Sequence, residues 1–204
     1  MDKEIRSFDF EIRADENERG KQISGRAIVY GQTTDMGWYD ETIADGALDA
    51  TDLRDVRLLV NHNTEMIPVA RSRNNTANST MQLKVVPGGG LDMIATLDTE
   101  NNVDARALYS AVDRGDITGM SFMFQVDSDK WDDIDTERPK RTILSIRRVF
   151  ELSAVTFPAY DKTTIQARGL SEALESARAS LESEKARRAA VARHKQKIRL
   201  LTEV

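Results

Sequence analysis

The chain has 204 residues, of which 40% are hydrophobic and 31% are charged, enough apolar material for one core. It contains no cysteine, which excludes disulfides and thiolate metal sites and fits a reducing cytoplasm. No apolar run approaches the roughly 18 residues that a membrane span needs, and the first residues lack the apolar stretch of a signal peptide. We therefore expect that the protein has no membrane partner. We also expect that it acts in the compartment where the chain is made.

Residues 1–168 read mostly as strands and turns. Apolar residues alternate with charged residues over 8–13, the period-two pattern of a half-buried strand. A second strand is predicted over 23–31, and Gly25 within it suggests a β-bulge. The short apolar run VRLLVNH, over 56–62, predicts a buried strand that ends at a histidine.

A hairpin and a helix are predicted in the middle of the chain. Two strand-like runs flank residues 87–90, where three glycines supply the backbone conformations that a tight reversal needs. A helix is predicted to begin after Asn101 or Asn102, either of which can cap it, and to stop at Gly115. Its apolar positions on or near one face are Val103, Leu108, Ala111 and Val112.

The last part of the predicted body is again strand-like. The run ITGMSFMFQV, over 117–126, predicts a strand, and KWDDIDTERPK, over 130–140, predicts a polar loop. Residues 141–157 predict one long strand, or two strands with a bend, ended by Pro158. The body therefore reads as a mainly β domain with few helices.

The composition changes after Arg168. Residues 169–204 are rich in good helix formers and carry 8 Lys and Arg against 5 Glu, so the acidic excess of the chain lies in the body. An apolar seam through Leu174 and Leu181 is too narrow to bury the helix by itself. We expect a helical tail that docks on a partner or pairs as a coiled coil, and a solvated helix is the alternative.

Three residues have the chemistry of a serine hydrolase. His62, Ser121 and Glu151 each stand among strand-like apolar residues, and the other histidine, His194, lies in the charged tail. A serine hydroxyl needs a base to become a nucleophile, and imidazole, with a pKa of about 6.5, suits that task. We therefore predict Ser121 as the nucleophile, His62 as the general base and then acid, and Glu151 as the group that holds the imidazole.

Each of the three residues also has a structural explanation. His62 could simply close a strand, and Ser121 could be a packing choice between Met120 and Phe122. Glu151 could form a salt bridge with one of the two arginines that precede it, Arg147 or Arg148. A competing nucleophile exists in the same strand, because Ser153 lies on the same strand face as Glu151.

The order of short segments resembles the prohead (procapsid maturation) protease family of tailed bacteriophages, which is related to herpesvirus assemblin. The segments are GRAIVYG, ETIADGAL, VRLLVNHN, GGGLDMIATLD, DRGDITGMSFMF and VFELSAVTFPAYDKTTIQAR. Together they cover roughly residues 20–168. One departure is Met123, since the position two residues after the serine is often glycine in the family.

The resemblance implies an α+β fold, mainly an antiparallel β-barrel with flanking helices, over residues 1–168, with 169–204 as a tether or incorporation segment. It implies a serine endopeptidase that works in the host cytoplasm, inside the assembling procapsid. Its substrates would be the scaffold, often part of the major capsid protein, and finally itself. The herpesvirus relatives place a second histidine where Glu151 stands here, and they act as dimers.

Other functions remain open at this point. A non-enzymatic capsid-assembly or scaffolding protein could keep the barrel and use the helical tail to nucleate shells. A nucleic-acid-binding protein that uses the basic tail is disfavoured by the acidic body and the scarce aromatic residues. The sequence has no clustered metal ligands on one element and no nucleotide-binding glycine loop, so we expect no metal and no cofactor.

Overall fold

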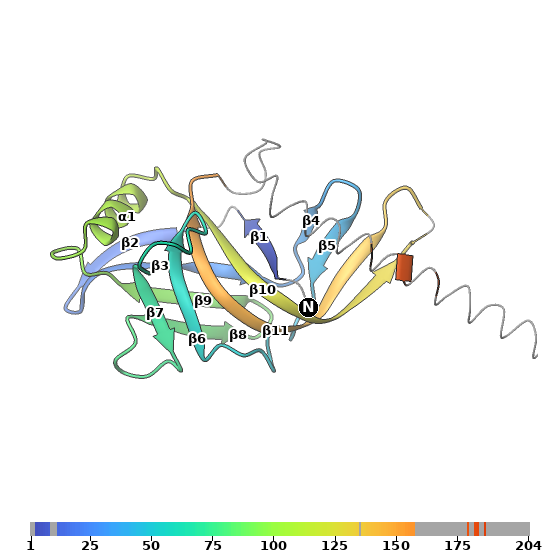
Figure 1. Cartoon of the computed structure of the whole chain (residues 1–204), viewed down its shortest axis with the longest axis horizontal. Helices are drawn as coiled ribbons and strands as arrows, with labels where there is room; N and C mark the ends of the chain where they lie inside the picture. The colour runs from blue at the N-terminus through green and yellow to red at the C-terminus, as the bar shows by residue number, and fades with distance from the viewer. Residues whose placement is uncertain are drawn as a thin grey trace, which may run out of the picture.

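The computed structural model describes residues 3–8, 12–134 and 136–157, together with four separate residues of the tail, Ala179, Glu182, Ser183 and Ala186. Within this part of the chain the strands form two sheets, and one helix packs against the second of them (Figure 1). No helix in the described part of the chain is both long enough and apolar enough to cross a membrane.

The larger sheet is built on two long strands, β10 and β11, which pair antiparallel along their whole length. Strand β1 pairs with β10, and the first half of β11 pairs in parallel with β5, which pairs with β4. The second half of β11 pairs in parallel with β6, which pairs with β7. The strands are β1 Glu4–Phe8, β4 Thr33–Asp35, β5 Asp40–Ile43, β6 Asp55–Val60, β7 Ala70–Arg73, β10 Gly119–Asp132 and β11 Lys140–Val155.

The smaller sheet is antiparallel in the order β2-β3-β9-β8. Its strands are β2 Ile12–Asn17, β3 Gly20–Val29, β8 Met81–Val86 and β9 Gly90–Thr96. The helix, α1 Val103–Asp113, packs on β2 and β3. One apolar core joins the two sheets, and Phe122, Phe124 and Leu152 enter it from β10 and β11.

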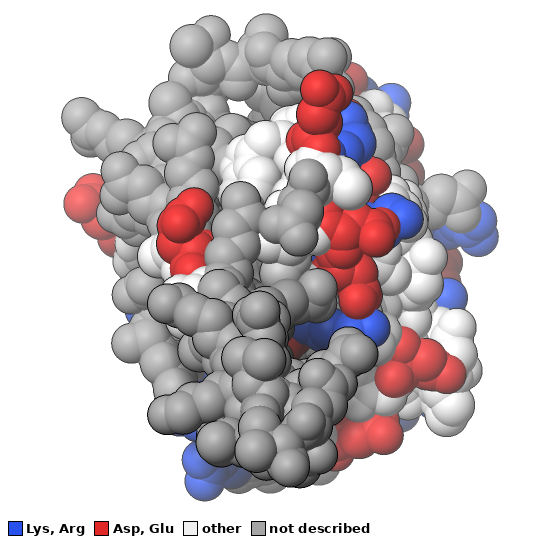
Figure 2. Space-filling model, turned by 90° about the vertical axis from the view of Figure 1, so that its right-hand side faces the viewer, with Lys and Arg blue, Asp and Glu red and all other residues white. Residues whose placement is uncertain are grey.

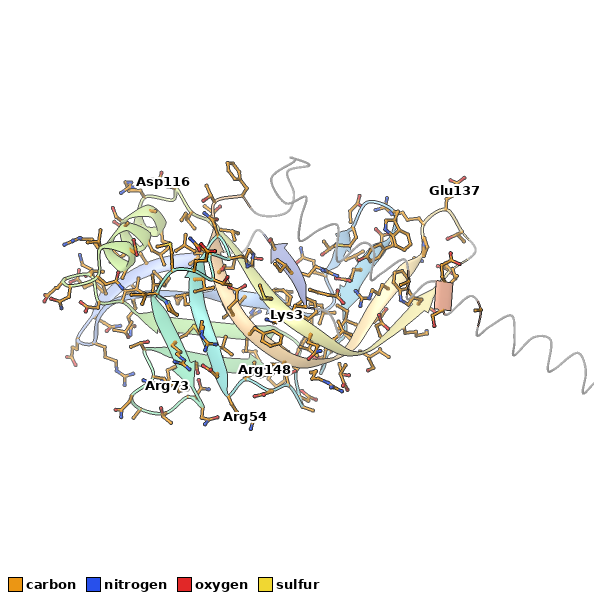
Figure 3. All side chains as sticks on the ribbon, in the orientation of Figure 1. Lys3, Arg54, Arg73, Asp116, Glu137 and Arg148 are labelled. Carbon is orange, nitrogen blue, oxygen red and sulfur yellow. The ribbon has the colours of Figure 1, made fainter. Side chains whose placement is uncertain are left out.

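The pleat of β10 and β11 separates a core face from a polar face. Phe122 pairs with Leu152, and both side chains are fully buried in the core. The neighbouring positions in the same ladder, Ser121 and Ser153, therefore point to the opposite face of the sheet. In Figure 3, Asp116, just before β10, and Glu137, in the loop after it, lie toward opposite ends of the described part of the molecule, so β10 runs along most of its length.

The polar loop predicted over 130–140 is shorter in the structure, at the tip of the β10–β11 hairpin. Strand β10 continues to Asp132, and Trp131 stacks on Trp38 at 5.7 Å and lies 5.1 Å from Tyr39, measured between ring centroids. These aromatic rings supply a second small core that holds the hairpin tip against the loop before β5. Figure 2 views this end of the molecule and shows acidic and basic side chains side by side on its described part. Lys140 and Asp133 form an exposed ion pair at the hairpin tip.

The helix prediction is confirmed in its caps and wrong at one face position. The Asn102 side chain accepts hydrogen bonds from the backbone N–H groups of Asp104 and Ala105, and Gly115 follows with φ of +75°. Val103, which we expected near the apolar face, is 66% exposed, because the buried face is made by Ala105, Leu108 and Val112.

The strand predicted over 8–13 can be followed only at its two ends, because residues 9–11 lie outside the described residues. Phe8 belongs to β1, which pairs with β10 in the larger sheet, and Ile12 and Arg13 belong to β2, which pairs with β3 in the smaller sheet. The bulge expected at Gly25 lies at Ala27, where the register with β9 shifts between Arg26 and Ile28.

The mainly β fold with a helix is confirmed, but the described strands do not form a closed barrel. Strands β7 and β8 lie next to each other where the two sheets approach, yet no strand pairing joins them. Instead, the β7 backbone N–H groups of Arg71 and Arg73 donate to the side-chain hydroxyls of Thr80 and Ser79, at 2.9 Å each. The helical tail predicted over 169–204 lies outside the described residues, except for four exposed residues in helical conformation.

The β8–β9 hairpin depends on Gly90. This residue has φ of +130°, and a Cβ atom there would lie 1.9 Å from the carbonyl oxygen of Ile28. We expect Gly90→Ala to lower the free energy of unfolding by more than about 2 kcal/mol, because strain and overpacking add. Denaturant unfolding measures this, with Gly88→Ala as the control, since Gly88 also has positive φ but open space around it. Equal losses in the two variants would contradict the close-approach explanation.

A buried ion network ties β1 to the rest of the larger sheet. Arg6 on β1 binds both Glu4 and Glu41, and Arg141 binds the same two carboxylates at 2.7 to 2.9 Å. A fifth group, Asp129, accepts from Arg141 at 2.7 Å. All but Asp129 have side chains no more than 5% exposed. The network therefore fixes the position of β1 beside β10.

The network predicts a loss of stability in acid. Burial by itself raises the pKa of Glu4, but hydrogen bonds and charge from Arg141 and Arg6 outweigh burial and lower this pKa from its ordinary value of 4.5. The folded state therefore binds fewer protons than the unfolded state, so the contribution of Glu4 is complete above pH 4.5 and is lost as the pH falls through the lowered value. Thermal unfolding between pH 3 and pH 6 should show a shallower acid decline for Glu4→Gln than for the wild type. An equal decline of the melting temperature with falling pH in the two proteins would contradict the stabilising role of the Glu4 carboxylate.

Candidate active site

His62 lies in a tight turn directly after β6. Both Asn61 and His62 have left-handed backbone conformations, with φ of 50° and 56°. Such conformations are costly for residues other than glycine and persist only where the surroundings hold them. The Asn61 side chain is bonded to Thr156 in both directions, at 3.0 Å each, and the His62 backbone N–H donates to the Ser153 hydroxyl at 3.1 Å.

The turn brings the imidazole onto a buried carboxylate. His62 Nδ1 lies 2.6 Å from Glu151 Oε1, and the two side chains are 20% and 3% exposed. The second oxygen of the carboxylate, Oε2, accepts from the Ser153 hydroxyl at 2.6 Å. The alternative of a salt bridge between Glu151 and the preceding arginines is wrong, because Arg147 binds Asp127 and Arg148 faces Asp52.

The other ring nitrogen of His62 is the most informative atom of the site. Nε2 is buried and has no hydrogen-bond partner within the described part of the chain. Buried polar atoms without a partner are rare in proteins and call for an explanation. With Nδ1 held by a carboxylate, Nε2 is the atom that can take a proton from a nucleophile.

Ser121 lies on the neighbouring strand, directly opposite Ser153 in the β10–β11 ladder. On its other side it is paired with Ser7 of β1. Its hydroxyl donates to the Arg6 carbonyl oxygen at 2.8 Å and accepts from the Ser7 hydroxyl at 2.8 Å, and the side chain is fully buried. The structure thus joins His62 directly to Glu151 and holds Ser121 one strand away, in hydrogen bonds with β1.

Four positions at the site were not anticipated from the sequence. Ser7 and the Arg6 carbonyl hold Ser121, although β1 lies outside the segments that carry the family resemblance. Asn61 and Thr156 hold the histidine turn. Only Asn61 carries a usable signal, because asparagine just after a strand is among the residues that most readily adopt positive φ.

The start of β10, the end of β11 and the end of β6 converge, and the site lies where they meet (Figure 1). In the part of the chain that the structure describes, no group of three or more histidines and acidic residues is arranged to hold a metal ion. The chemistry available from these side chains is proton transfer by an imidazole that a carboxylate holds, beside a ladder of serine hydroxyls.

The model of the family described as caudovirus prohead serine protease matches this chain over residues 8–176. Comparisons with curated proteins and with solved structures gave no match. The matched range includes β2 to β11 and all of the residues discussed as the site except Arg6 and Ser7 of β1. The chain therefore belongs to the caudovirus prohead serine protease family.

Proposed function

We propose that this protein is a serine endopeptidase that cleaves capsid scaffold, and finally itself, inside the procapsid during phage head maturation. Membership of the prohead protease family supports a protease of capsid maturation. The observation that carries the proposal for the site is the His62–Glu151 pair at 2.6 Å, with Nε2 of the imidazole buried and unpartnered within the described residues.

In the proposed reaction, Ser121 Oγ attacks the carbonyl carbon of the scissile peptide bond and gives its proton to His62 Nε2. The tetrahedral adduct collapses as the C–N bond breaks, and His62 passes the same proton to the leaving amine. Water then attacks the acyl-enzyme, giving one proton to His62, which returns it to Ser121 as the ester C–O bond breaks. The products are a free carboxyl group and a free amine, and the enzyme is regenerated.

Glu151 is proposed as the third member of the site. Its contact with Nδ1 selects the tautomer in which Nε2 is free to accept a proton, and its charge stabilises the imidazolium that forms. A carboxylate so buried keeps its orientation through the Ser153 hydroxyl. For the reaction to begin, the Ser121 hydroxyl must exchange its hydrogen bond with the Arg6 carbonyl for one with His62.

We further propose residues 1–168 as the catalytic domain and 169–204 as the segment that tethers the protease in the procapsid. The basic excess of this segment, on an otherwise acidic chain, supports its binding to a partner. Self-cleavage close to Arg168 would release it. An intact tail in proteins extracted from mature particles, measured by mass spectrometry, would contradict the release.

Coexpression of the full chain with the capsid precursor tests the proposed function. The wild type should shorten the precursor at a defined bond, which intact mass measurement identifies. A non-enzymatic scaffolding protein, the alternative function, predicts full-length precursor in assembled shells whether position 121 holds serine or alanine. Shells of uncleaved precursor with the wild-type chain would therefore reject the protease.

A further inference from the structure

Ser153 occupies a buried position at which a serine hydroxyl is unfavourable unless it forms hydrogen bonds. The side chain is fully buried in the middle of the larger sheet, between β10 and β6, and its neighbours Leu152 and Ala154 lie in the apolar core. A buried hydroxyl without hydrogen-bond partners destabilises a protein. Alanine at the same position would fill the strand without burying a polar group. The two hydrogen bonds of Ser153 therefore define its role.

Both hydrogen bonds end on the proposed acid–base pair. The Ser153 hydroxyl donates to Glu151 Oε2 at 2.6 Å and accepts from the backbone N–H of His62 at 3.1 Å. The carboxylate is thus held at both oxygens, by Ser153 at Oε2 and by the imidazole at Oε1. The same hydroxyl also holds the backbone of the turn in which His62 has φ of 56°.

We propose that Ser153 is a positioning residue, whose hydroxyl links the Glu151 carboxylate to the His62 backbone and so sets the orientation of the imidazole. This inference rests on the proposed function of the site, and it assigns Ser153 a role other than that of a competing nucleophile. Its hydrogen is committed to a carboxylate, and none of its hydrogen bonds involves the imidazole ring.

The Asn61–Thr156 bonds do not make Ser153 redundant. They fix the residue before the histidine and join the turn to the end of β11. They leave the carboxylate untouched, so among the described residues it is the Ser153 hydroxyl that connects the backbone of the turn to the Glu151 carboxylate. Loss of the Ser153 hydroxyl should therefore loosen the His62–Glu151 contact while the turn itself stays in place.

The test compares Ser153→Ala with a matched control in the same strand. Ser145 also lies on β11, and its hydroxyl bonds to that of Ser128 on β10 at 2.7 Å, on the exposed surface. Ser145→Ala therefore removes a hydrogen-bonded serine hydroxyl from the same strand, β11, away from the site. Ser153→Thr restores a hydroxyl at position 153 and serves as the rescue.

The first measurement is the NMR signal of the proton between His62 Nδ1 and Glu151, which is independent of activity. A His194→Gln background leaves His62 as the single histidine in the chain, so the assignment is direct. We expect a low-field imidazole N–H resonance in the parent and in Ser145→Ala. It should be lost through solvent exchange in Ser153→Ala and regained in Ser153→Thr. If Ser153→Ala does not fold, Ser153→Cys keeps the volume with a weaker hydrogen bond, and its resonance should shift.

The second measurement is steady-state cleavage of the capsid precursor by the full chain. Ser153→Ala should lower kcat roughly 10-fold to 100-fold with KM little changed, because a misplaced base slows the chemical step without touching substrate binding. An unchanged resonance and unchanged kcat in Ser153→Ala would overturn the proposal, as would covalent labelling of Ser153 by a fluorophosphonate. If the wild type neither cleaves nor becomes labelled, the protease function fails, while the NMR comparison still decides the role of Ser153.

Discussion

Replacing Ser121 with alanine should abolish proteolysis while the fold remains intact. We expect kcat/KM for the capsid precursor to fall on the order of 10⁴-fold to 10⁶-fold, because the nucleophile, its base and the supporting carboxylate act as a unit. The change removes two hydrogen bonds, to the Arg6 carbonyl and from Ser7, which should cost only about 1–3 kcal/mol of unfolding free energy. Cleavage kinetics and thermal unfolding of the same preparation separate the two effects.

The control for this loss is again Ser145→Ala, which should cleave at the wild-type rate. Retention of more than a tenth of the activity in Ser121→Ala would contradict the assignment of the nucleophile. If Ser153→Ala instead lost activity to the extent expected for Ser121→Ala, and Ser121→Ala kept its activity, the nucleophile would be Ser153.

Breaking the buried ion network should give the largest loss of stability. Arg141→Met leaves Glu4 and Glu41 buried with Arg6 as their one remaining guanidinium in the network. Removing one partner from a buried ionic cluster typically costs about 3–5 kcal/mol, because the remaining charge is left without compensation. For a chain of this size the melting temperature should fall by roughly 6–20 °C. Differential scanning calorimetry at neutral pH measures the shift.

The matched control for Arg141→Met is Arg147→Met on the same strand. Arg147 pairs with Asp127, and both side chains are about half exposed, at 51% and 48%. Exposed pairs of this kind contribute less than about 1 kcal/mol, so Arg147→Met should barely change the melting temperature. Equal shifts in the two variants would mean that the buried network contributes no more to stability than a surface ion pair.

Much of the fold was predictable because local signals and tertiary structure agree. The β8–β9 hairpin and helix α1 follow from glycines and an asparagine cap, and these act over a few residues. The strand that delivers His62 is also where the apolar run predicted it. In these segments the chain carries its own turn and cap chemistry, so no distant contact is needed to place them.

Apart from Val103 on the exposed side of α1, the failures in the fold are questions of long-range pairing. Nothing local to Trp131 shows that it stacks on Trp38, so its charged surroundings suggested a loop. The alternation around residue 8 does not reveal that β1 and β2 join different sheets. The closed barrel that the family resemblance implied is not formed by the described strands, because the backbone N–H groups of Arg71 and Arg73 on β7 bond to hydroxyl side chains and not to another strand.

Of the candidate site, the pairing of His62 with Glu151 was predictable from the sequence, but the hydrogen bonds around this pair were not. The contact of His62 with Glu151 agrees with the carboxylate expected beside the imidazole. The hydrogen bonds of the Ser121 hydroxyl could not be inferred, because they depend on β1, whose Ser7 lies 114 residues away in the sequence. The bridging role of Ser153 likewise requires knowing that the β6 turn and the end of β11 meet.

Covalent labelling shows directly whether Ser121 is the group that His62 activates. The full chain is treated with a fluorophosphonate, and the modified residue is identified by peptide mass spectrometry in the wild type and in His62→Gln. We expect a single adduct on Ser121 that forms in the wild type and is lost in His62→Gln. An adduct on another serine, or equal labelling of Ser121 without the imidazole, would contradict it.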